Sequence, residues 1–119
     1  MLVTLLKSKI HRATVTGASV DYEGSLTIAS DLAERAGFAR FERILVGNMG
    51  NGNRFETYVI YGAPGSGAIE LNGATALLGK PGDRLTIMSF AQLTPEEAAS
   101  HKPRALLLGP DNRVERETY

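Results

Sequence analysis

Cysteine is absent from the 119-residue sequence. This absence excludes disulfide bonds, zinc sites built on thiolates and cysteine nucleophiles, and it fits a reducing cytosol. A surplus of charge is also absent, because 13 Lys and Arg residues balance 13 Asp and Glu residues. No net field therefore favours nucleic acid or an anionic membrane as a partner.

Long apolar runs are missing as well. The run at residues 1–6 has no basic segment before it. It is too short for the core of a signal peptide and far below the ~20 residues of a membrane span. We therefore expect a cytoplasmic protein with no membrane partner. A chain of 119 residues is expected to form one domain that buries a substantial core.

Glycine, in contrast, is abundant. It makes up 13 of the 119 residues, more than the usual ~7%, which indicates many tight turns. Short runs with β-branched residues at close to period 2 predict roughly seven strands. These runs lie at 2–6, 13–20, 26–29, 43–49, 53–62, within 68–78, at 83–90 and at 104–109, before a polar tail. The pattern predicts a mainly β fold, a small closed barrel that leaves no long strand edge exposed.

Two or three short helices are expected between the strands. Asp31 is a candidate cap with Glu34 three residues later, and Gly37 is suited to end that helix. Thr94 precedes Pro95 at the first helical position and Glu97 at the third, which predicts a helix of about two turns. A further helical turn is expected after the Asn-Gly pair at 72–73.

The run 53–62 is the best-defined strand of the sequence and follows a turn signal at Asn51-Gly52. Because side chains alternate along a strand, the sequence predicts two faces. One carries Arg54, Glu56 and Tyr58, and the other carries Phe55, Thr57, Val59 and Tyr61.

Several resemblances to binding motifs fail on spacing. The segment 73–81 has five residues between its glycines and Pro after the lysine, so it does not match a phosphate-binding P-loop. The glycines of 62–67 are not spaced as in a dinucleotide fingerprint, and a mobile loop is expected there. His11 and His101 have no carboxylate cluster beside them, so no metal site is expected. The basic stretch 7–12 reads as one face of a strand, not as a nucleic-acid patch.

Gly24 and Ser25 stand directly before the strand 26–29. A turn is one explanation for this pair. The other is a site at which the serine attacks its own backbone. The residues alone leave both explanations open.

Five ordered segments decide between them by resemblance: 6–16, 22–25, 51–60, 65–76 and 81–83. In order and spacing they resemble the family of pyruvoyl-dependent aspartate 1-decarboxylases. The resemblance implies a double-psi β-barrel of six to seven strands, formed by residues 1–119 as a single domain and cleaved into 1–24 and 25–119. It also implies a homotetramer with active sites at subunit interfaces.

The implied activity is decarboxylation of L-aspartate to β-alanine and carbon dioxide, in the supply of pantothenate and coenzyme A. The implied cofactor is a pyruvoyl group made from Ser25, which holds the substrate as a Schiff base, without metal or pyridoxal phosphate. The roles implied by the resemblance are catalysis by Ser25 and Tyr58, self-processing by Gly24, Ser25, Thr57 and Asn72, substrate binding by Lys9, Arg54, Thr57, Gly73, Ala74 and Thr75, and support by His11 and Tyr22.

Some points stay open at the level of sequence. Thr57 is expected on the strand face opposite Arg54 and Tyr58, which requires either a bulge or contributions from neighbouring subunits. The sequence departs from the family at Ala63-Pro64 and at Thr75. It does not indicate whether a maturation helper protein takes part. The alternative function is a small β-barrel binding module without catalysis.

Overall fold

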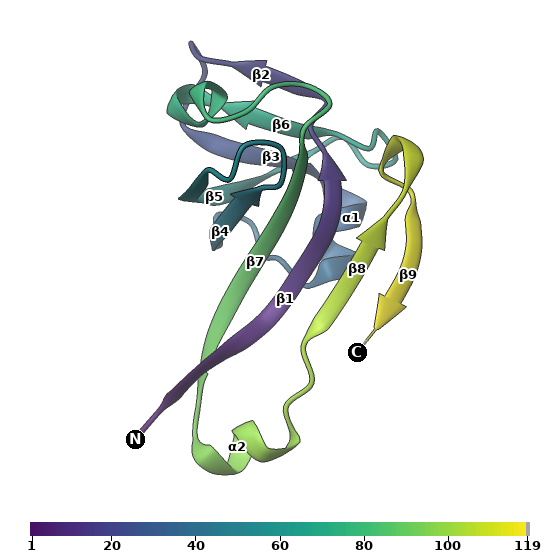
Figure 1. The fold of residues 1–119 in the computed structure, drawn as a ribbon. Helices are drawn as coiled ribbons and strands as arrows, with labels where there is room; N and C mark the ends of the chain where they lie inside the picture. Colours follow the sequence, from purple (N-terminus) through teal and green to yellow (C-terminus); the bar gives the residue numbers. More distant parts are fainter. Residues whose placement is uncertain (119) are drawn as a thin grey trace.

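A computed structural model describes residues 1–118 (Figure 1). Within this range the chain forms nine strands: β1 (Val3–Thr14), β2 (Gly17–Ser19), β3 (Ser25–Ala29), β4 (Arg43–Asn48), β5 (Arg54–Gly62), β6 (Ile69–Asn72), β7 (Arg84–Leu93), β8 (Arg104–Leu108) and β9 (Val114–Thr118). Two α-helices, α1 (Ser30–Ala36) and α2 (Pro95–Ser100), and two 3-10 turns, η1 (Gly73–Leu77) and η2 (Pro110–Asn112), lie between them. The expected mainly β fold with short helices is confirmed.

The strands form one mixed sheet in the order β2-β6-β3-β5-β4-β7-β1-β8-β9. Three pairs are parallel, β2 with β6, β3 with β5 and β1 with β8, and the other five pairs are antiparallel. Figure 1 shows β1 and β7 running together away from the other strands toward α2. The opposite end of the sheet carries β2, β6 and β3, and therefore Ser25.

The core is built from alternate strand positions and one face of α1. Leu26 and Ile28 of β3, like Ile87 of β7, are fully buried, and α1 contributes Leu32, Ala33 and Ala36. Complete burial of a Leu or Ile side chain contributes about 1.5–3 kcal/mol. The core face of the sheet is thus fixed by period-2 patterning, and the polar residues between these positions are turned to the other face.

The first strand differs from its prediction. Residues 2–6 and 13–20 were expected as two strands, but β1 is one strand from Val3 to Thr14, and β2 is a separate short strand. The division into two strands was wrong, but the stretch 7–12 does lie on a strand as expected: it joins the first run to residues 13–14 within β1, which pairs with β7. Two bulges adjust the register, and Arg12 takes a left-handed backbone at the second one.

Two further predictions were wrong. The polar tail contains β9, an edge strand antiparallel to β8. The α1 helix has no side-chain cap, because the Asp31 carboxylate instead accepts a hydrogen bond from the Gly65 amide at 2.9 Å. The capping box of α2, from Thr94 to Glu97, is confirmed, as is the left-handed Gly37 at the end of α1. Within residues 1–118, neither helix is long and apolar enough to cross a membrane.

Candidate active site

Ser25 is the first residue of β3, and its side chain is completely buried, whereas Gly24 before it is exposed. The Ser25 hydroxyl donates a hydrogen bond to the Glu23 carbonyl at 3.2 Å and accepts one from the Asn72 amide nitrogen at 3.0 Å. The bond to Glu23 turns the hydroxyl back along the chain, toward the residues that precede β3. A buried nucleophile therefore lies beside an exposed Gly24-Ser25 linkage.

Asn72 faces Ser25 because the two residues are register partners in the β3–β6 ladder. Its amide also donates to the Thr27 hydroxyl at 2.8 Å. Thr75, in η1, donates to the Asn72 carbonyl at 2.8 Å and lies 3.4 Å from the Ser25 carbonyl. All four side chains are buried, and each has a polar partner, as buried polar groups require.

Gly73 lies against the loop that leads into Ser25. Its φ is +66°, and a Cβ there would lie 2.6 Å from the Gly24 Cα and 2.9 Å from the Tyr22 carbonyl oxygen. Only glycine combines this conformation with so close an approach. The backbone of Tyr22 thus packs on η1, although its side chain is 58% exposed.

Tyr58 is on β5, the strand next to β3, one residue before the first register pair of the β3–β5 ladder. The parallel β3–β5 ladder pairs Leu26 with Val59, so Ser25 and Tyr58, each one residue earlier, share a face. The β4–β5 register runs from Arg54 to Tyr58 without a shift. A bulge is therefore excluded in this part of β5, and Thr57 points to the opposite face, where its register partner is the buried Ile44.

The basic candidates Lys9, His11 and Arg54 form a row on the same face as Tyr58. His11, Thr86, Gly47 and Arg54 are successive register partners across β1, β7, β4 and β5. Lys9 is two residues from His11 and shares its face. Across three strand spacings, His11 lies about 14 Å from Arg54, and Arg54 lies about 13 Å along β5 from Tyr58.

His11 is partly enclosed in this row, with its Nδ1 3.4 Å from the Thr86 hydroxyl oxygen. Burial lowers the pKa of its imidazole, and the positive charges of Lys9 and Arg12 lower it further. The side chain is therefore held in its neutral form at neutral pH.

One chain thus gathers Ser25, Gly24, Asn72, Gly73, Thr75 and Tyr58 at one end of the sheet, with Ala74 exposed on η1. It does not bring Lys9, His11, Arg54 or Thr57 to Ser25. Among residues 1–118, no three His, Cys, Asp or Glu side chains are grouped to hold a metal ion.

Comparison with known proteins shows the family of the chain. The sequence model of the family described as aspartate decarboxylase matches residues 1–115. The chain belongs to the aspartate decarboxylase family. Aspartate 1-decarboxylase of Desulfotalea psychrophila is 50% identical over 114 residues, which cover 96% of each chain. The enzyme of the same name from Ruminiclostridium cellulolyticum is 50% identical, over 99% of this chain and 92% of its own. That of Lactiplantibacillus plantarum is 49% identical, over 96% of this chain and 88% of its own.

Two contacts at the site of this aspartate decarboxylase family member were missing from the sequence interpretation. Thr27 shares the Asn72 amide with Ser25, and the Glu23 carbonyl accepts from the Ser25 hydroxyl. Period-2 alternation along β3 would have indicated Thr27, because residues 25 and 27 share a face. No local sequence signal indicates the Glu23 carbonyl.

Proposed function

We propose that this chain is a self-processing aspartate 1-decarboxylase, a carboxy-lyase that converts L-aspartate to β-alanine and carbon dioxide, in the supply of pantothenate. The observation that carries the proposal is the buried Ser25 hydroxyl, held by Asn72 beside the exposed Gly24. Membership of the aspartate decarboxylase family supports the substrate and the reaction.

The first step is cleavage between Gly24 and Ser25. The Ser25 Oγ attacks the Gly24 carbonyl carbon, the C–N bond breaks, and the proton passes to the released Ser25 amine. Loss of the Ser25 Cα proton then breaks the Cβ–Oγ bond and releases Gly24 as a carboxylate. The resulting dehydroalanine takes up a proton at Cβ and becomes an imine, which water hydrolyses, so that ammonia leaves and a ketone remains at residue 25.

Several residues favour this step. Gly24 is exposed and has no Cβ of its own to crowd an approach to its carbonyl. A serine hydroxyl is a weak nucleophile, so it needs a positioned partner and support for the oxyanion. Asn72 is the nearest donor to the hydroxyl, and a donor of this kind contributes about 3–4 kcal/mol in enzymes that use one. We assign Thr57 to processing on the resemblance alone.

The surroundings of Ser25 fit a pyruvoyl group. Residue 25 is fully buried, the Asn72 amide nitrogen and the Thr75 hydroxyl lie beside it, and the missing side chain of Gly73 lets the Gly24 backbone pack close to η1. Such a group supplies an electrophilic carbonyl that binds the substrate amine and accepts the electrons released when carbon dioxide departs.

The remaining residues bind substrate and move a proton. The planar guanidinium of Arg54 suits a carboxylate, because it can donate to both oxygens, and Lys9 adds positive potential for a dianionic substrate. The backbone of Gly73, Ala74 and Thr75 lines the substrate position, with His11 and Tyr22 in support. Tyr58, next to Ser25 in register, donates the proton that replaces the carboxylate on the substrate carbon.

We further propose that the chain is a single double-psi barrel domain, cleaved into 1–24 and 25–119, and that it works in the cytoplasm as a homotetramer. The placement of Arg54 within one chain supports the assembly. Its Cα lies about 13 Å along β5 from that of Tyr58, and its exposed side chain is available to a substrate held by a neighbouring copy. A second copy that supplies Arg54 and Lys9 would complete the site.

Two variants test the proposal. Ser25→Ala lacks the nucleophile, so we expect it to fold, stay full length and release no carbon dioxide from L-aspartate. Tyr58→Phe keeps the cleavage machinery, so we expect normal cleavage with turnover reduced at least about 100-fold, the range for a positioned proton donor. Denaturing electrophoresis measures cleavage, and carbon dioxide release measures turnover.

The two readouts separate the outcomes. If Tyr58→Phe keeps full turnover, Tyr58 is not the proton donor. If Ser25→Ala and the unaltered chain are both uncleaved and inactive under all conditions, the non-enzymatic binding module becomes the better explanation.

A further inference from the structure

Phe41 has an unusual backbone for its residue type. It lies in the turn between α1 and β4 with φ of +65°, a region that disfavours bulky side chains. Its side chain is 70% exposed, so burial in the core does not offset this strain. A strained, exposed aromatic residue calls for a reason other than packing.

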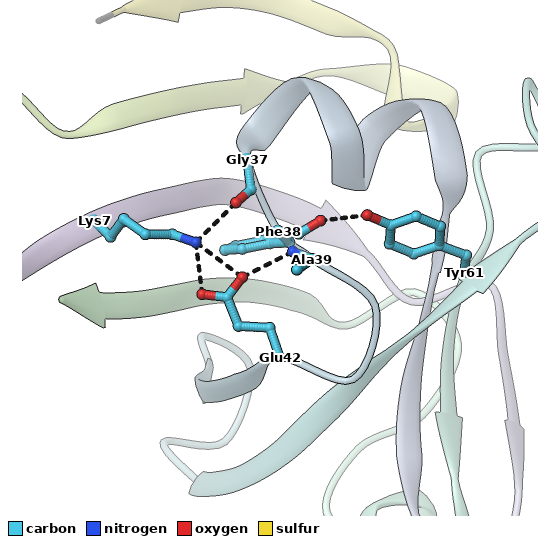
Figure 2. Close-up of polar contacts among 6 residues, drawn as sticks. All are labelled: Lys7, Gly37, Phe38, Ala39, Glu42 and Tyr61. Carbon is cyan, nitrogen blue, oxygen red and sulfur yellow. Dashed lines mark hydrogen bonds and ion pairs between the residues drawn. The ribbon is translucent and has the colours of Figure 1, made fainter.

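The turn that carries Phe41 is anchored on its β1 side (Figure 2). The Lys7 amine binds both Glu42 carboxylate oxygens, at 2.7 and 2.9 Å, and donates to the Gly37 carbonyl at 2.9 Å. The same carboxylate accepts a hydrogen bond from the Ala39 amide at 2.8 Å. Both ends of the turn are thereby held to β1.

A second set of contacts anchors the turn on β5. The Tyr61 hydroxyl donates to the Phe38 carbonyl at 2.5 Å, as Figure 2 shows. The Phe41 amide donates to the Val59 carbonyl at 2.8 Å, and the Val59 amide donates to the Glu42 carbonyl at 3.0 Å. These bonds fix the backbone on both sides of Phe41.

The Phe41 ring packs against the ring of Tyr58. The two ring centroids are 6.4 Å apart and the ring planes are inclined by 47°, within the range of favourable aromatic pairs. Tyr58 neighbours Val59, to which the turn is bonded, so the anchored turn and the Tyr58 ring are held in one frame.

We propose that Phe41 is a positioning residue that fixes the Tyr58 ring on the Ser25 face of the sheet through their aromatic contact. This inference rests on the proposed function, in which Tyr58 donates a proton to the substrate. A phenol on a half-exposed strand face rotates about χ1 unless something packs against it. The Phe41 ring limits this rotation and holds the Tyr58 ring in one orientation.

Two substitutions distinguish positioning from a structural role. Phe41→Asn removes the ring and tolerates the left-handed backbone, whereas Phe41→Tyr keeps both the ring and the strain. In protein labelled with 3-fluorotyrosine, the Tyr58 fluorine resonance is assigned by its loss in Tyr58→Phe. We expect Phe41→Asn to shift and narrow this resonance, with a melting temperature equal to or above that of the unaltered chain. Phe41→Tyr should leave the resonance in place.

The kinetic expectation follows from the same contact. In Phe41→Asn we expect kcat to fall about tenfold with KM and self-cleavage unchanged, a part of what a positioned proton donor contributes. Phe41→Tyr should retain kcat. An unshifted Tyr58 resonance in Phe41→Asn, or a lowered melting temperature without a change in that resonance, would overturn the inference. Full turnover in Tyr58→Phe would instead refute the proton-donor role while leaving the fluorine result intact.

Discussion

Residue 25 combines two properties that proteins usually separate, a buried side chain and an accessible neighbouring linkage. The hydroxyl is kept inside by bonds to Asn72 and Glu23, while Gly24 stays outside. Leaving one buried member of such a cluster without its partner costs about 1–3 kcal/mol. The cluster around Ser25 thus favours folding, and in the proposed mechanism it holds the hydroxyl beside the linkage that it attacks.

His11 gives a prediction about pH. Its folded-state pKa is lowered by burial and then by Lys9 and Arg12, so the folded state prefers the neutral ring. The stabilisation is present above the unfolded pKa of about 6.5 and is lost as the pH falls through the folded value. We expect the free energy of unfolding to decrease from about pH 7 to pH 5 at fixed protein concentration.

His11→Gln serves as the comparison. Urea titrations of both proteins across this range should give a smaller decrease for His11→Gln. Equal slopes for the two proteins would show that other groups cause the dependence.

For individual residues, the sequence predicted only the strand face on which each side chain lies, because period-2 alternation gives no information on pairing between strands. It placed Thr57 opposite Arg54 and Tyr58, and the unshifted β4–β5 register confirms this. It could not pair Ser25 with Asn72, because 47 residues separate them and only the β3–β6 register brings them together. Their shared role came from resemblance to a family.

At the scale of elements, η1 packs closely on the loop 20–24. Gly73 is the contact point, because its missing side chain lets Gly24 approach. Gly52, in the turn before β5, offers a matched position: its φ is also positive, at +79°, but a Cβ there would meet nothing within 4 Å.

Substituting each of these two glycines by alanine distinguishes the effect of the left-handed backbone, which both share, from the effect of a contact with Gly24 and Tyr22, which only Gly73 makes. Both Gly73→Ala and Gly52→Ala should lose about 1 kcal/mol through the left-handed backbone. Only Gly73→Ala should displace the 22–24 loop, so we expect it to slow self-cleavage at least tenfold while Gly52→Ala cleaves at the unaltered rate. Time courses of cleavage by electrophoresis measure this, and equal rates would remove Gly73 from the processing site.

Elements with a local signal were predicted, and those shaped by distant partners were not. The capping box of α2 lies within four residues and was recognised. The predicted cap of α1 was wrong because the Asp31 carboxylate accepts a hydrogen bond from the amide of Gly65, which is 34 residues away in the sequence. The strand β9 was missed because its pairing with β8, not its composition, holds the polar tail in an extended form.

At the scale of the whole molecule, the separation of the site residues is the main feature. Ser25 and Tyr58 lie at one end of the sheet, and Arg54, His11 and Lys9 form a row on the same face farther along. Because the strand order includes three parallel pairs, local patterns could not have predicted this layout.

A hybrid experiment tests whether two chains share one site. Ser25→Ala cannot make the electrophile, and Arg54→Ala cannot bind the carboxylate, so each protein alone should be inactive. Co-expression should restore activity at about a quarter of the sites, where a cleaved residue 25 from one chain meets Arg54 from another. Co-expressing Ser25→Ala with Ser25→Ala,Arg54→Ala is the control. Absence of recovery in stable mixed oligomers would contradict a shared site.

The account depends most directly on the linkage between Gly24 and Ser25, and intact-mass spectrometry of the purified protein under denaturing conditions tests it. The predicted result is two fragments, residues 1–24 and 25–119, the second lighter by one ammonia than the product of simple hydrolysis. A chain that stays at full length, or a second fragment with the hydrolytic mass, would contradict the account.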